Sequence, residues 1–252
     1  GKKTVLITGA SRRLGRCFAE AMAHDGWVVA LHYHQNASEA KSAACTIREQ
    51  GGQVTLHQAD LTDVSQVLSL AQEVGSAEAP WLGLINNAGL FLPDEAHDFV
   101  PERLQQHMAV NFTAPTLLIQ KLAQQCPHGR EAVVLNILDA KLFGLNPDYY
   151  SYTLSKMALH AVTEMAALSY APQVRINGIA PGITLPAPGQ DEEAFQRSHR
   201  KNLLGRSSTV TEVIAAARFL LKTRSITGHV TLLDGGAHLA PPRRDVAFET
   251  EQ

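Results

Sequence analysis

Short apolar runs alternate with longer stretches of helical spacing along the chain, and this rhythm limits the folds it can adopt. The runs are Thr4–Thr8, Val28–His32, Val54–Gln58, Leu82–Asn86, Ala132–Ile137, Val174–Ile179 and Val230–Leu233. Most of them are continuously apolar, which is typical of strands buried on both faces of a parallel sheet. Repeated strand–helix–strand units with right-handed crossovers build a doubly wound sheet. We therefore expect an α/β fold.

The intervening stretches show the apolar spacing of amphipathic helices. One stripe consists of Leu14, Cys17, Phe18, Ala21 and Met22, and another of Val213, Ala216, Ala217, Leu220 and Leu221. We expect Ser38 to cap the N-terminus of a helix that runs to Gln50, with Gly51-Gly52 as its stop.

No internal repeat, low-complexity tract or charge run marks a boundary, so we expect one domain over residues 1–240. Two segments depart from the strand–helix rhythm. Thr184–Asn202 contains Pro186, Pro188 and Gly189 and then a polar helical stretch. Because it follows the sixth strand, we expect a lid over a cleft at about residues 183–202. The polar tail, residues 241–252, is expected to be poorly ordered unless it docks on a partner chain.

The composition excludes several classes of protein. Lys and Arg total 22 and Asp and Glu total 24, so the net charge of −2 provides no global basic field for nucleic acid or an anionic membrane. No apolar run reaches the ~20 residues that a membrane-spanning helix needs. The three cysteines (Cys17, Cys45 and Cys126) are far apart and in no CxxC pair, which is typical of reduced thiols. We expect a cytoplasmic protein that binds neither nucleic acid nor membrane.

A glycine-rich turn follows the first strand and opens a helix. Glycine lets the backbone approach a phosphate closely, and the helix N-terminus behind it favours an anion. The turn predicts a dinucleotide site with contacts from Gly9, Ser11, Arg12, Arg13, Leu14 and Gly15. The usual GxGxxG spacing is absent, so a plain strand-to-helix turn stays open as the alternative.

The end of the second strand indicates which nicotinamide cofactor would bind. An acidic residue there would accept from a ribose 2′-hydroxyl, whereas basic groups would hold a 2′-phosphate. The candidate contacts Tyr33, His34, Gln35 and Asn36 include no acid, and two arginines lie on the adjacent turn. This arrangement favours NADP(H). His32 and His34 share one strand face, but no further ligand joins them, so we expect no metal site.

Tyr152 and Lys156 lie four residues apart at the start of a strongly helical stretch. This spacing places both side chains on one helix face. A nearby ammonium favours the phenolate and lowers the pKa of a tyrosine, so Tyr152 is a candidate proton donor near neutral pH. A solvated helix face gives the same spacing by chance.

Together these motifs resemble the short-chain dehydrogenase/reductase family, from Thr4 to about Leu239. The matching elements are Thr8-Gly9 to Gly15, Asp60-Leu61, Asn86-Asn87-Ala88-Gly89, Asn111, Tyr152 to Lys156, Pro181-Gly182 and Asp234-Gly235-Gly236. The resemblance implies a single Rossmann-like sheet of seven strands and a homotetramer.

The resemblance also implies roles for single residues. Asp60 and Leu61 would contact the adenine, and Asn87, Ala88 and Gly89 would line the ribose side. Lys156 would bind the nicotinamide ribose and polarise Tyr152, while Asn111 would anchor a water that relays protons to Lys156. Pro181, Gly182 and Ile183 would hold the carboxamide edge.

Two departures from the family pattern carry information about the substrate. Arg13 stands where the family typically has glycine, and Asp139 where it has serine. An ionised carboxylate would repel the charge that develops on a ketone oxygen, but it accepts from N–H groups. Asp139 therefore suits a substrate with ring nitrogens and an amino group, unless the side chain points away from the site.

Both departures resemble the pteridine reductase branch of the family. That branch shares Arg13-Leu14-Gly15, His32-Tyr33-His34 and Asp139, and an aromatic residue that would here be Phe91 stacks on the pterin. Arg13 would then contact both pyrophosphate and pterin. The branch often has serine at Gly89 and a basic residue near Gln35, and this chain departs from it at both positions.

We therefore expect NADPH-dependent reduction of a C=N bond in a dihydropteridine, such as dihydrobiopterin, dihydromonapterin or dihydrofolate. Asp139, Tyr152, Lys156 and Asn111 would be catalytic, and Arg13, Phe91, Asp139 and Tyr152 would bind the substrate. A short-chain carbonyl reductase acting on a 3-oxoacyl thioester, ketone or sugar is the alternative. A non-enzymatic NADP(H)-sensing protein is a further one.

Overall fold

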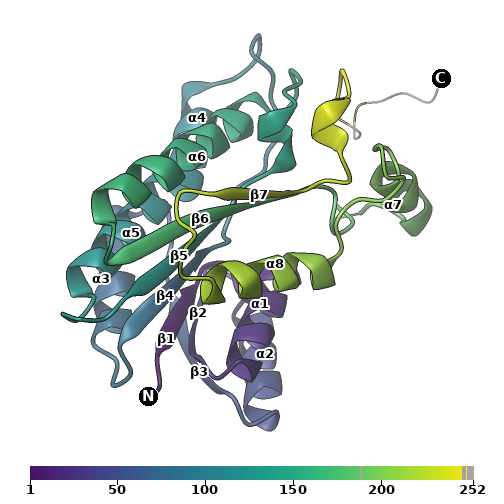
Figure 1. Cartoon of the computed structure of the whole chain (residues 1–252). Coiled ribbons are helices and arrows are strands. Elements are labelled where there is room, and N and C mark those ends of the chain that lie inside the picture. The colour runs from purple at the N-terminus through teal and green to yellow at the C-terminus, as the bar shows by residue number, and fades with distance from the viewer. Residues whose placement is uncertain (188, 246–247, 249–252) are drawn as a thin grey trace.

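Seven parallel strands form one sheet in the order β3-β2-β1-β4-β5-β6-β7 (Figure 1). The computed structural model describes residues 1–187, 189–245 and 248. The strands are β1 (Thr4–Ile7), β2 (Val28–Tyr33), β3 (Gln53–Gln58), β4 (Trp81–Asn86), β5 (Ala132–Ile137), β6 (Val174–Pro181) and β7 (Val230–Leu233). Each predicted strand is confirmed to within two residues at its ends, because continuous apolar runs such as Val5–Ile7 are fully buried between two helical layers.

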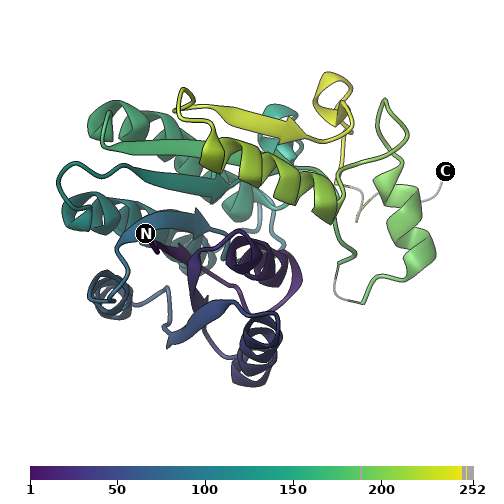
Figure 2. The ribbon, with the colours of Figure 1, turned by 60° about the horizontal axis from the view of Figure 1, so that its bottom comes forward.

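Helices cover both faces of the sheet. On one face α1 (Arg13–His24) packs against α2 (Ala37–Glu49) and α8 (Val210–Lys222). On the other, α5 (Ala114–Gln125) packs against α3 (Val64–Gly75) and α6 (Tyr150–Tyr170), and α4 (Pro101–Met108) lies on α6. A π-helical turn, η1 (Ala109–Thr113), joins α4 to α5. Figure 2 shows α7 (Glu192–His199) set apart from both layers, near the end of the sheet where the strands finish.

The start of α2 differs from the sequence prediction. The helix begins at Ala37 with Asn36 as its N-cap, so the assignment of Ser38 as the cap is wrong. The physical reason is that the Asn36 carbonyl already accepts the helical bond from Ala40 N–H at 3.0 Å, which leaves Ser38 inside the first turn, bonded to Glu39. The helix ends at Glu49, one residue before the predicted Gln50. Gly51 does stop it, at a φ of +82°.

The chain beyond β7 contacts earlier parts of the protein. After the short 3₁₀ turn η3 (Ala237–Leu239), residues 241–245 lie against the rest of their own chain. These five residues dock on their own chain, where Arg244 pairs with the buried Asp148 carboxylate, and the prediction of poor order in the tail stays a prediction. Residues 246, 247 and 249–252 of the predicted tail, and Pro188 of the predicted lid, lie outside the described residues.

No helix among the described residues is long and apolar enough to cross a membrane. All three cysteines are free thiols.

Candidate active site

The strand order reverses between β1 and β4, and ligands of doubly wound sheets bind outside the carboxyl ends of the strands at such a point. Two adjoining cavities open there. The glycine-turn cavity, about 710 Å³, lies against the turn after β1, and the Asp139 cavity, about 420 Å³, lies beyond the ends of β5 and β6. Arg13, Phe91 and Tyr152 line both, so one elongated ligand, or two ligands in contact, would meet at these three side chains.

The glycine-turn cavity contains most of the predicted cofactor contacts. They are Gly9, Ser11, Arg12, Arg13, Leu14, Gly15, Tyr33, His34, Gln35, Asn36, Asp60, Leu61, Asn87, Ala88, Gly89 and Lys156. The turn is compact: a Cβ on Gly15 would lie 2.1 Å from the Gly9 carbonyl oxygen. The Asn87 amide donates to the carbonyl oxygens of Thr8 and Gly9, at 3.0 and 3.1 Å. These contacts fix a glycine-lined backbone cradle of the kind that admits a phosphate.

His32 fixes this turn from the second strand. Its Nδ1 accepts from Gly9 N–H, and its Nε2 lies 3.0 Å from the Ala59 carbonyl oxygen. Burial lowers the pKa of His32 to about 4, so the ring is neutral and can make one donated and one accepted bond. The His34 ring lies 3.7 Å from the Asp60 carboxylate, and the described residues contain no cluster of three or more His, Cys, Asp or Glu side chains that could hold a metal.

Tyr152 and Asp139 are in direct contact. Asp139 follows β5 and caps the 3₁₀ turn η2 (Ala140–Phe143); its Oδ1 accepts from Lys141 N–H at 2.8 Å and its Oδ2 from the Tyr152 hydroxyl at 2.8 Å. Both residues line the Asp139 cavity, so the carboxyl group faces the candidate site rather than pointing away. The pair presents one hydroxyl and one carboxylate to a ligand.

The electrostatics of Tyr152 differ from the sequence prediction. Burial and the Asp139 charge raise the pKa of Tyr152 well above its usual value, whereas the nearby ammonium was expected to lower it. The reason is geometric. The Lys156 Nζ donates to the Ile137 carbonyl oxygen at 2.7 Å and lies 6.0 Å from the centre of the Tyr152 ring, while Asp139 is in direct contact. Burial lowers the pKa of Lys156 to about 8.

Asn111 lies fully buried in the π-helical turn, an irregularity often found at functional sites. Its amide oxygen accepts from Leu90 N–H at 2.8 Å, and its amide nitrogen donates to the Leu90 carbonyl oxygen and to Ser155 Oγ. A Cβ on Gly89 would lie 3.7 Å from Asn111 Oδ1 and 3.8 Å from Lys156 Nζ. Asn111 Oδ1 and Lys156 Nζ therefore face the same side of Gly89.

Phe91 belongs to an aromatic cluster beside the two cavities. Its ring stacks on Tyr149 with centroids 4.0 Å apart and an interplanar angle of 16°, and it meets Tyr152 edge-on at 4.6 Å. Phe91 remains 49% exposed, so it offers apolar surface to a flat ligand.

Arg13 has a left-handed backbone, with φ +53°, at a position where the family's usual glycine would pay no steric cost. Its guanidinium donates to the Pro186 carbonyl oxygen at 2.8 Å. The arginine thus joins the glycine turn to the segment that follows β6.

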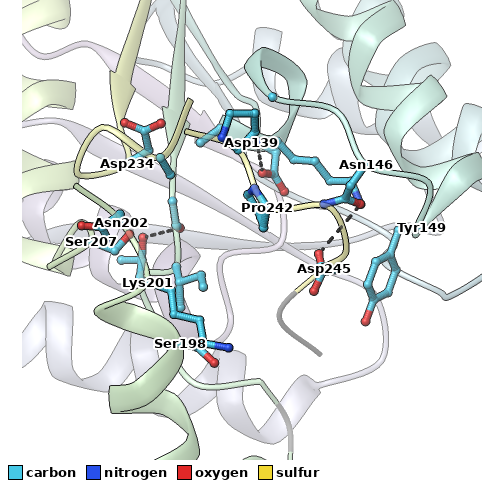
Figure 3. Close-up of a pocket in the computed structure, with 18 of the residues that line it drawn as sticks. Asp139, Asn146, Tyr149, Ser198, Lys201, Asn202, Ser207, Asp234, Pro242 and Asp245 are labelled. Carbon is cyan, nitrogen blue, oxygen red and sulfur yellow. Dashed lines mark hydrogen bonds and ion pairs between the residues drawn. The ribbon is translucent and has the colours of Figure 1, made fainter. Parts of the chain in front are cut away.

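The remaining predicted residues divide between the cavities and their surroundings. Gly182 and Ile183 line the Asp139 cavity, whereas Pro181 and Asn111 are not among the described residues that line either cavity. Sequence reasoning missed Tyr149, Lys141 and Asp245, which line the Asp139 cavity. Figure 3 shows Tyr149 and Asp245 beside Asp139. Tyr149 carried a local signal, an aromatic residue just before the Tyr152 helix; Lys141 and Asp245 carried none.

This fold and this pair of cavities define a nucleotide-cofactor oxidoreductase scaffold. A family model described as enoyl-(acyl carrier protein) reductase matches residues 9–238. The chain belongs to the short-chain dehydrogenase/reductase family.

Three relatives are informative about the branch. The chain is 30% identical to pteridine reductase 1 of Leishmania tarentolae, over 93% of this chain and 96% of that one. It superimposes on the alternative dihydrofolate reductase 1 (FolM) of Brucella suis, solved in complex with NADP, with a TM-score of 0.90 and 36% identity over 94% of this chain and 95% of that one. The reductase LugOII, which catalyses a keto-reduction, gives a TM-score of 0.85 and 29% identity over 94% and 98% of the two chains.

Proposed function

We propose that this chain reduces a dihydropteridine to its tetrahydro form with NADPH. The observation that carries the proposal is the Asp139 carboxylate, which faces a cavity in hydrogen-bond contact with the Tyr152 hydroxyl. A carboxylate opposes ketone reduction because it repels a developing oxyanion, but it accepts from the N–H and amino groups of a pterin. The names of the pteridine reductase and alternative dihydrofolate reductase relatives support the same substrate class.

The residues around the glycine turn fit an NADP(H) molecule. The turn has no room for a side chain at Gly15, because its Cβ would lie 2.1 Å from the Gly9 carbonyl oxygen, and this compact glycine turn would hold the phosphates. Arg12 and Arg13 are exposed beside the cavity, and Tyr33 to Asn36 place no acid against a 2′-phosphate. When bound, the cofactor supplies the hydride.

The protein residues bind the substrate and move the proton. Tyr152, whose raised pKa keeps it protonated, donates its proton to the ring nitrogen next to the reduced carbon, directly or through water. Asp139 orients the Tyr152 hydroxyl and accepts from substrate N–H groups. Lys156 and Asn111, whose polar atoms both lie near the same side of Gly89, are the proposed route by which the proton is replaced.

Substrate binding would use the aromatic and cationic side chains shared by the two cavities. The Phe91 ring would stack on the heteroaromatic ring of the substrate, and the Tyr149 ring packs against Phe91. Arg13, which lines both cavities, would contact both cofactor and substrate. We propose that residues 183–202 close over the substrate ring and exclude water. The hydrogen bond from Arg13 to the Pro186 carbonyl oxygen, which links this segment to the glycine turn, supports the proposal.

A carbonyl reductase is the second candidate, because Tyr152 and Lys156 serve a ketone equally well and LugOII reduces a keto group. The test is NADPH oxidation, followed by absorbance, with 7,8-dihydrobiopterin, dihydromonapterin, dihydrofolate and acetoacetyl-CoA. We expect turnover with at least one pterin. Rapid turnover of the thioester with none of any pterin would defeat the proposal, and tight NADPH binding with no turnover at all would indicate an NADP(H) sensor.

Two further properties remain proposals. We propose that the protein is a homotetramer, which light scattering would establish, and that it is cytoplasmic, which cell fractionation would test. Three free thiols are compatible with a reducing compartment.

A further inference from the structure

The C-terminal segment Pro241–Asp245 forms part of the wall of the Asp139 cavity (Figure 3). Pro241, Pro242 and Asp245 line it, and Pro241 packs so closely on the turn after η2 that a Cβ on Gly144 would lie 2.6 Å from the Pro241 Cβ. The Asp245 carboxylate lies 3.8 Å from the Lys141 Nζ, which lines the same cavity. The segment therefore shapes the space that a substrate would occupy.

Arg244 holds this segment in place. Its Nε donates to Asp148 Oδ1 at 2.8 Å and Oδ2 at 3.0 Å, and its Nη2 donates to Asp148 and, at 2.9 Å, to Glu95 Oε1. The Asp245 N–H donates to Asp148 Oδ2 at 2.5 Å. The Asp148 side chain is fully buried, and the hydrogen-bond donors from the C-terminal segment, together with the nearby Lys141 charge, stabilise its carboxylate.

The two acidic partners of Arg244 belong to the two loops that carry the aromatic pair. Glu95 lies four residues after Phe91 in the loop that follows β4, and Asp148 immediately precedes Tyr149. Those rings stack at 4.0 Å beside the cavity. One guanidinium, 96 residues away from Asp148 along the chain, thus joins both loops.

We propose that Arg244 is a positioning residue for the substrate site. It clamps the C-terminal segment over the cavity and keeps the Phe91 and Tyr149 rings stacked on each other. The identity of the substrate rests on the proposed function; the clamp itself does not. Without Arg244, the Asp148 carboxylate loses its hydrogen-bonded guanidinium and the two loops lose the side chain that joins them, so substrate binding weakens. The NADPH-binding turn lies on the other cavity and keeps its contacts.

The test compares Arg244→Ala with Arg243→Ala, since Arg243 is exposed and adjacent. We expect Arg244→Ala to raise the KM for the best dihydropterin at least tenfold, with kcat and the NADPH Kd changed less than threefold. Arg243→Ala should leave all three unchanged within twofold. Arg244→Lys keeps the positive charge but cannot bond to Asp148 and Glu95 at once as the guanidinium does, so it should give an intermediate KM. If Arg244→Ala does not fold, the comparison of Arg244→Lys with Arg243→Ala is the test.

Hydrogen exchange provides a readout that needs no substrate. In Arg244→Ala, amides of residues 91–98 and 146–153 should exchange at least tenfold faster, while those of residues 8–16 should not change. If the wild-type protein turns over no pterin, the proposed function is refuted. The hydrogen-exchange result then tests by itself whether Arg244 acts as a clamp. Equal exchange and equal KM in the Arg244 and Arg243 variants would refute the clamp even where pterin turnover is rapid.

Discussion

Replacing Asp139 tests the central chemical argument, because the residue separates a pterin site from a ketone site. In Asp139→Ser the carboxylate is lost, together with its contact to Tyr152 and any bond to substrate N–H groups. A hydrogen bond to a charged group contributes about 1.5–3 kcal/mol. At about 1.4 kcal/mol for each factor of ten, kcat/KM for a dihydropterin should fall roughly 10- to 150-fold.

The same substitution should act in the opposite direction on a ketone. Removing the negative charge lifts the repulsion of a developing oxyanion, and a serine hydroxyl can donate to it. Acetoacetyl-CoA reduction should therefore hold or rise. Asp139→Asn keeps the shape and loses only the charge, so we expect an intermediate loss of about fivefold on the pterin, corresponding to roughly 1 kcal/mol.

The pH profile adds a second readout. The Asp139 charge, with burial, raises the pKa of Tyr152, and it also opposes the burial that lowers the pKa of Lys156 to about 8. Loss of that charge favours the deprotonated form of both groups, so the alkaline limb of kcat/KM should move to lower pH in Asp139→Ser. The assay is NADPH oxidation from pH 6 to 10. Pterin rates within twofold across the Asp, Asn and Ser series, with an unmoved alkaline limb, would refute the reasoning.

Three further predictions follow from the glycine turn. The pKa of His32 is about 4 in the folded chain against 6.5 when unfolded, so the unfolded state binds more protons between these two values. The free energy of unfolding should therefore fall as the pH drops from 6.5 to 4. Urea unfolding of the wild type should show a decrease of up to about 3 kcal/mol over this range, and His32→Gln should not show it. In Gly15→Ala the new Cβ would lie 2.1 Å from a carbonyl oxygen, so NADPH binding should weaken more than tenfold in a fluorescence titration. In Gly89→Ala the nearest atom would lie 3.7 Å away, so binding should weaken far less. Equal NADPH Kd values for the two variants would contradict the assignment of the glycine turn as the phosphate site. Arg13→Gly relieves left-handed backbone strain of about 1–2 kcal/mol and costs about 0.5–1 kcal/mol in chain entropy. The free energy of unfolding should therefore change by no more than about 1 kcal/mol, while the KM for the pterin should rise. An unchanged KM would show that Arg13 does not contact the substrate.

The sequence predicts the sheet well because each strand is encoded locally. A run such as Ala132–Ile137 is apolar at every position except Asn136 and becomes a fully buried central strand, and no distant residue is needed to foresee it. The predicted site residues at the carboxyl ends of these strands come together for the same reason, because parallel strands finish at one edge of the sheet.

The remaining features depend on partners that are distant in sequence. The Asp148–Arg244 pair and the bonds from Ser151 to Asp94, 57 residues away, have no local signal. The raised pKa of Tyr152 was missed because spacing alone reports Lys156, four residues away, and not the direction in which its ammonium points. A side chain's helix face can be read from spacing, but its final hydrogen bond cannot.

Because Asn111 lies in a π-helical turn, its position depends on the number of residues between α4 and α5. In this turn the backbone bonds span one residue more than in an α-helix, so α4 and α5 flank it in a phase that an uninterrupted helix could not provide. Excising a single residue from 109–113 would let the two helices fuse and would rotate one relative to the other by about 100°. The amide of Asn111 would then turn away from Leu90 and Ser155, so we expect deletion of one residue from 109–113 to break these hydrogen bonds.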